Sequence, residues 1–106
     1  MRFGLSDQLI ERMQSVFMKH PEIESVLIYG SRAMGHYREG SDIDITLLGK
    51  ALSEEIRSKV FWELDDLNTP YSFDLSIYHG LNSPDLEDHI QRVGKVFYTR
   101  KSLNVE

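Results

Sequence analysis

GSRAMGHYREGSDID, residues 30–44, joins a Gly-Ser pair, a polar loop and two alternating aspartates in one continuous run. The run SVLIYG that leads into it, residues 25–30, is short, rich in residues that favour β-structure and stopped by glycine. That pattern predicts a buried strand ending at Gly30. We expect a short helical turn over residues 31–34 and a loop over residues 35–41.

The aspartates at the end of this stretch begin a second predicted strand. In DIDITLL, residues 42–48, apolar and polar residues alternate strictly, so Asp42 and Asp44 share one face while the isoleucines share the other. SFDLSIY, residues 72–78, repeats the alternation and places Asp74 on its polar face. The sequence thus predicts three carboxylates on the side of a sheet that faces away from the core.

Three further segments have the caps and the apolar spacing of helices, and residues 96–98 suit a last short strand. The predicted helix starts and ends are Ser6 and Pro21, Ser53 and Pro70, and Ser83 and Gly94. The resulting order of elements predicts an α+β fold of two layers, in which helices pack on the apolar face of the sheet and the aspartates occupy the other.

The composition limits the class of protein. A chain of 106 residues fits one domain over residues 1–106. Without cysteine there is no disulfide, thiolate zinc site or cysteine nucleophile, and no apolar run is long enough to cross a membrane, so we expect a cytoplasmic protein without a membrane partner. The net charge of −5 argues against direct binding to nucleic acid.

These residue types suit the handling of a nucleoside triphosphate. Neighbouring carboxylates repel one another, and Mg²⁺, which prefers oxygen ligands and substrate phosphates, removes that repulsion. Two ions can clamp the attacking and leaving oxygens at phosphorus. Gly30 lets the backbone approach phosphate, the Ser31 hydroxyl can donate to it, and Arg32 is either a phosphate contact or a surface side chain. Ser41 either caps the turn into its strand or is merely exposed.

The Gly30-Ser31 pair, ten intervening residues and Asp42-Ile43-Asp44 resemble the signature of the polymerase β-like nucleotidyltransferases, most closely the minimal nucleotidyltransferases called MNT or MntA-like. The resemblance extends through Asp74. It implies a mixed sheet with helices on one face and transfer of a nucleoside monophosphate from ATP or another triphosphate, with two Mg²⁺, or Mn²⁺, as cofactor. It also implies that Asp42, Asp44 and Asp74 bind metal and that Asp74 helps deprotonate the attacking hydroxyl.

The resemblance further implies a partner. Such proteins commonly act as antitoxins to a helical HEPN ribonuclease and adenylylate one of its tyrosines, which makes them protein adenylyltransferases. Larger relatives carry a second, helical domain for the acceptor, and 106 residues leave no room for one, so we expect the acceptor surface to come from another chain.

The aspartate pattern is also compatible with different roles. An isolated DxD occurs in metal-dependent glycosyltransferases and in ordinary surface strands, and Asp74 can be a simple polar-face residue. The alternative function is a non-catalytic antitoxin that binds nucleotide and neutralises its HEPN partner by forming a complex. A third possible function is transfer of the nucleotide to a small molecule. His20, His79 and His89 are not expected to be ligands, because they lack the paired spacing of a zinc site.

Overall fold

The protein is described here by a computed structural model that covers residues 1–100. Its elements follow in the order α1 (Asp7–Met18), β1 (Ser25–Tyr29), α2 (Gly30–Met34), β2 (Ile43–Leu48), α3 (Glu54–Asp65), β3 (Phe73–Ile77), the 3₁₀ turn η1 (Tyr78–Gly80), α4 (Pro84–Val93) and β4 (Lys95–Thr99). The predicted helices and strands are all present. Asp42 differs from the expectation in one respect, because it precedes β2 instead of belonging to it.

Serine caps begin the three longer helices, as the sequence predicts. The Oγ atoms of Ser6, Ser53 and Ser83 accept hydrogen bonds from the backbone N–H three residues later, at 3.1, 3.3 and 3.2 Å. Each bond satisfies one of the N–H groups that a helix leaves free in its first turn. Pro84 occupies the first turn of α4, where its missing N–H costs nothing.

The four strands form one mixed sheet in the order β3-β2-β1-β4. β1 is antiparallel to both β2 and β4, whereas β2 and β3 run parallel and are connected through α3. Asp44 lies opposite Tyr29 on one side and opposite Asp74 on the other. Because directly paired residues point to the same face of a sheet, these three side chains belong to one face.

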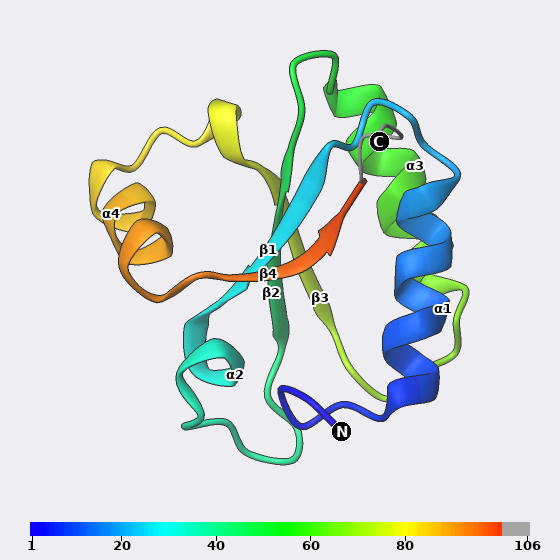
Figure 1. The fold of residues 1–106 in the computed structure, drawn as a ribbon, viewed down its shortest axis with the longest axis vertical. Coiled ribbons are helices and arrows are strands. Elements are labelled where there is room, and N and C mark those ends of the chain that lie inside the picture. The colour runs from blue at the N-terminus through cyan, green and yellow to red at the C-terminus, as the bar shows by residue number, and fades with distance from the viewer. Residues whose placement is uncertain (101–106) are drawn as a thin grey trace, which may run out of the picture.

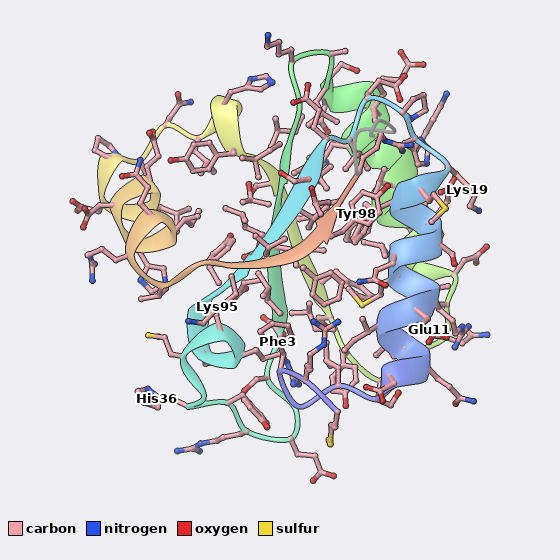
Figure 2. The ribbon with its side chains drawn as sticks, viewed as in Figure 1. Phe3, Glu11, Lys19, His36, Lys95 and Tyr98 are labelled. Atoms are coloured by element: carbon pink, nitrogen blue, oxygen red, sulfur yellow. The ribbon has the colours of Figure 1, made fainter. Side chains whose placement is uncertain are left out.

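The main core lies between the sheet and the pair α1 and α3, which cover the same face (Figure 1). Ile43, Ile45 and Leu47 of β2 are fully buried there. Phe17 of α1 is also fully buried and packs edge-to-face against Phe97 of β4, with ring centroids 6.2 Å apart. The charged side chains of Glu11 on α1 and of Lys19 just after it point away from the sheet (Figure 2).

The α+β architecture with helices packed on one face is confirmed, but the last helix does not join that layer. α4 and the short α2 lie on the opposite side of the sheet from α1 and α3 (Figure 1). The amphipathic pattern of α4 predicts a helix with one apolar face and says nothing of which side of the sheet it covers. Its buried residue, Ile90, closes a second and smaller apolar layer beside the aspartates.

We expect Phe17→Ala to lower the free energy of unfolding by about 3–5 kcal/mol, because it opens a cavity under the rings of Phe97 and Tyr98. Urea denaturation followed by circular dichroism measures the loss. Met18→Ala is the matched control, since the adjacent Met18 side chain is 62% exposed and should change the free energy by less than about 0.5 kcal/mol. Equal effects of the two substitutions would contradict this description of the core.

Candidate active site

The turn from β1 into α2 brings the backbone against a carboxylate. Gly30, the first residue of α2, has φ +72°, in the left-handed region that glycine adopts without strain. A Cβ at this position would overlap Oδ2 of Asp44. Glycine is therefore required twice here, by the backbone conformation and by the close approach of β2. Ser31 follows in the first turn of α2 and is partly exposed.

Asp44 and Asp74 are brought together by the parallel pairing of their strands. Their backbones are directly paired at the start of β2 and of β3. Asp74 is exposed and Asp44 is half-buried, while Asp42 is exposed immediately before β2. The alternation and the strand pairing thus place Asp44 and Asp74 on one face of the sheet, next to the Gly30-Ser31 turn. Asp42 lies just before β2, near enough for its charge to act on Asp44.

The charges of this cluster act on each other. The pKa of Asp44 is raised, first by burial and then by the neighbouring carboxylates of Asp74 and Asp42, and it is partly lowered by His89 and Arg32. A raised pKa means that the ionised form of Asp44 is disfavoured in the folded protein. The site therefore concentrates negative charge that the protein itself does not fully compensate.

The three carboxylates have the donor chemistry that a divalent cation requires. Their oxygen donors are the ligands preferred by Mg²⁺ and Mn²⁺, and a cation would relieve the repulsion that raises the pKa of Asp44. Within residues 1–100, no three acidic or histidine side chains converge closely enough to form a complete metal-binding cluster.

Arg32 occupies a different environment from the one expected of a phosphate ligand. Its side chain is only 2% exposed, and its guanidinium donates to the backbone carbonyl of Ser41 through Nε and Nη2 (3.2 and 2.9 Å) and to that of Phe3 through Nη1 (2.8 Å). It also lies against the rings of Tyr71 and Tyr37, 4.7 and 5.2 Å from their centroids. This geometry favours a positioning role over direct contact with phosphate.

Ser41 belongs to the turn that leads into Asp42. Its Oγ accepts a hydrogen bond from the backbone N–H of Arg38 at 2.8 Å, and its own N–H donates to the Arg38 carbonyl at 3.0 Å. Its carbonyl receives the fork of Arg32. Of the two roles that the sequence left open for Ser41, capping the turn agrees with these contacts.

Two residues of the site were missed by the sequence prediction. Tyr29 is 6% exposed and faces the carboxylates, and burial and Asp74 raise the pKa of its phenol while Ser76 partly offsets them. His89 of α4 packs edge-to-face on Tyr29, with ring centroids 6.2 Å apart. Tyr29 lies two residues after Leu27 in β1, and residues two apart in a strand share a face, so the sequence does indicate that Tyr29 points to the face opposite Val26 and Ile28. His89 had none, because only the packing of α4 brings it to the site.

This mixed sheet, with a Gly-Ser turn beside aspartates on two parallel strands, defines a nucleotidyltransferase fold. The family described as "Polymerase beta, Nucleotidyltransferase" matches residues 11–103, which is most of the chain. The protein belongs to the polymerase β nucleotidyltransferase family. No curated protein matches it closely enough to refine this assignment.

Solved structures share the fold. A chain of a toxin–antitoxin crystal structure with AMP-PNP superposes with a TM-score of 0.69 at 21% identity, over 92% of this chain and 76% of that one. A structure of an MNT antitoxin in complex with a tri-AMPylated HEPN toxin from Shewanella oneidensis superposes with a TM-score of 0.68 at 17% identity. The match covers 91% of this chain and 74% of that one. A putative nucleotidyltransferase from Sulfolobus solfataricus superposes with a TM-score of 0.55 at 25% identity, over 92% of this chain and 84% of that one.

Gly30→Ala should destabilise the protein more than Gly35→Ala. Both glycines have positive φ, so each substitution meets a backbone cost of roughly 1–2 kcal/mol, but only at Gly30 does the new Cβ strike a neighbour, Oδ2 of Asp44. Urea denaturation measures the two losses. Isothermal titration with Mn²⁺ should show weakened binding for Gly30→Ala alone. Equal losses with unchanged Mn²⁺ binding would contradict the close approach.

Asp44→Asn should raise the melting temperature by a few degrees at pH 7 in the presence of EDTA. Because the pKa of Asp44 is raised, the folded protein binds more protons than the unfolded chain between the ordinary and the raised pKa. Stability is therefore lost as the pH rises through that window, and a neutral side chain avoids the loss. Differential scanning calorimetry checks this, with the exposed Asp65→Asn as control; a lower melting temperature for Asp44→Asn alone would refute it.

Proposed function

We propose that this protein is a Mg²⁺-dependent nucleotidyltransferase that moves AMP from ATP to a hydroxyl on a protein partner, a tyrosine of a HEPN-domain toxin. The observation that carries the proposal is the pairing of Asp44 with Asp74 on adjacent strands, beside the Gly30 turn that only glycine can form. Membership of the nucleotidyltransferase family supports the general class of reaction.

The residues around the turn have the properties required to hold the triphosphate. The missing Cβ of Gly30 makes room for the Asp44 carboxylate at the turn. The Ser31 hydroxyl and the N–H groups at the start of α2 can donate hydrogen bonds to the oxygens of a phosphate group. Asp42, Asp44 and Asp74 would hold two Mg²⁺, with Mn²⁺ as a substitute. Bound metal supplies Lewis-acid polarisation of the phosphate and neutralises the charge on the leaving pyrophosphate.

The transfer itself is a displacement at the α-phosphorus. The oxygen of the acceptor hydroxyl forms a bond to that phosphorus, the bond between the α-phosphorus and the bridging oxygen to the β-phosphate breaks, and pyrophosphate leaves with the electron pair. The proton of the hydroxyl goes to Asp74, whose exposed carboxylate lies at the β3 end of the cluster, open to an incoming acceptor. Asp44, half-buried between Tyr29 and Asp74, is suited to hold metal.

The choice of partner rests on the structural relatives. They include an MNT antitoxin in complex with a tri-AMPylated HEPN toxin and the toxin–antitoxin pair MntA–HepT. The open position of Asp74 supports an acceptor on another molecule. Among residues 1–100, no helix is long and apolar enough to cross a membrane.

The Asp42→Asn, Asp44→Asn double variant should lower transfer at least about 100-fold, because removing the carboxylates removes the stabilisation that metal gives to the transition state. The assay incubates the protein with a purified HEPN-domain partner, ATP and MgCl₂, and weighs the partner by mass spectrometry. Asp65→Asn, which removes an exposed carboxylate on α3 away from the cluster, should transfer at the wild-type rate.

Two results would overturn the proposal. If the wild-type protein adds no nucleotide to the partner with ATP or with the other triphosphates, transfer to a HEPN protein is wrong. If the double variant still forms the complex and neutralises the toxin in cells, catalysis is dispensable and the protein acts by complex formation. The exposed Trp62, 62% accessible on α3 beside Phe61, is the surface that favours this second function.

A further inference from the structure

A buried and extensively hydrogen-bonded side chain next to the candidate site, Arg32, is not used in the proposed reaction. Arg32 is one of the few buried polar residues within residues 1–100, and three of its N–H groups donate to backbone carbonyls. The guanidinium, the carbonyls of Phe3 and Ser41 and the rings of Tyr37 and Tyr71 together form what we call the Arg32 clamp. Its parts come from segments far apart in the sequence.

Three parts of the clamp, Arg32, Ser41 and Tyr71, lie close in sequence to residues of the candidate site. Arg32 itself is two residues beyond Gly30, so it moves with the turn that faces the triphosphate. Ser41 immediately precedes Asp42, and Tyr71 lies three residues before Asp74. The two strand starts are further joined by a hydrogen bond from the N–H of Ile43 to the carbonyl of Ser72, at 2.9 Å. The clamp therefore ties the phosphate side of the site to both strands that carry the metal ligands.

The N-terminal turn is shaped to supply the third carbonyl contact. Phe3 and Gly4 both have positive φ, 59° and 72°, and the turn is closed by hydrogen bonds in both directions between Arg2 and Leu5. Leu5 is fully buried and anchors the turn in the core. A Cβ on Gly4 would overlap the Tyr37 ring and lie 2.8 Å from Nη1 of Arg32. The Phe3 ring packs against the main core, with its centroid 6.0 Å from that of Phe97.

A planar guanidinium is suited to this task. Its fork delivers two N–H groups to one carbonyl and a third to another while its face lies against aromatic rings, which an ammonium group does not do. The positive charge of Arg32 also acts on the carboxylates, because it partly lowers the pKa of Asp44. Outer groups of this kind orient metal ligands without touching the metal.

We propose that Arg32 is a positioning residue that sets the spacing between the phosphate-facing turn and the metal-binding aspartates, and that the N-terminal turn at Phe3 and Gly4 is part of the active-site framework. The contacts of the clamp are independent of the proposed function, whereas the effect of Arg32 on metal binding rests on that function. Arg32 acts through Asp42, Asp74 and Gly30, and contacts neither metal nor phosphate.

Two measurements test the structural effect of the clamp and its effect on metal binding separately. Hydrogen exchange of the Ile43 N–H, measured by NMR, reports on the joint between β2 and the segment before β3. In Arg32→Gln it should exchange at least about tenfold faster. Isothermal titration with Mn²⁺ reports on the ligands, and the same variant should bind about tenfold more weakly or worse. Arg32→Lys, which keeps the charge but loses the fork, should fall between Arg32→Gln and wild type.

Arg100→Gln is the matched control for a loss of stability alone. Arg100 also donates to three backbone carbonyls, those of Met18, His20 and Ile23, but at the other end of the sheet. It should lower the melting temperature and leave both the Ile43 exchange and the Mn²⁺ affinity unchanged. If Arg32→Gln does not fold, Gly4→Ala perturbs the same clamp from the N-terminal turn, with Gly35→Ala as its positive-φ control.

Three outcomes test the positioning role of Arg32. Faster exchange and weaker Mn²⁺ binding in Arg32→Gln or Gly4→Ala, but not in the controls, support the proposal. Unchanged exchange and Mn²⁺ affinity with a loss only of ATP affinity would overturn it and assign Arg32 to direct phosphate contact. If wild-type protein binds no Mn²⁺, the proposed function fails, whereas the exchange measurement still tests the clamp.

Discussion

The parallel pairing of β2 with β3 is the constraint on which the rest of the site depends. It sets Asp44 opposite Asp74, and the pairing of β2 with β1 sets Asp44 opposite Tyr29 and beside Gly30. The register is held from the other face, where Ile43, Ile45 and Leu47 are fully buried under α1 and α3. A slip of one residue would exchange the two faces, so the core and the site specify each other.

That constraint has an electrostatic cost. The carboxylate of Asp44 is half-buried near two other acids, and both burial and their charges raise its pKa. Nothing in the hydrophobic core requires this arrangement, since a neutral side chain of similar shape would satisfy the strand. Concentrated and undercompensated carboxylates are typical of a site that binds a cation, and here they accompany a turn that only glycine can make.

The two sides of the sheet are consequently unlike. One face carries the main apolar core, while the other carries a small layer under α4 and the charged cluster beside it. α4 does more than cover apolar surface, because it brings His89 onto Tyr29 next to Asp44. The clamp around Arg32 adds a second set of contacts from distant segments, because its guanidinium joins the carbonyl of Phe3 to that of Ser41, the residue before Asp42.

Local pattern by itself determined the elements, their polar and apolar faces, and the polar faces that carry Asp44 and Asp74, because alternation and capping act over a few residues. Tertiary structure decided the rest. Contacts between distant segments decide which side of the sheet α4 covers and bring His89 onto Tyr29. They also bury Arg32 against Phe3 and Tyr71. A charged residue after a Gly-Ser pair looks free to meet phosphate, and only packing turned it inward.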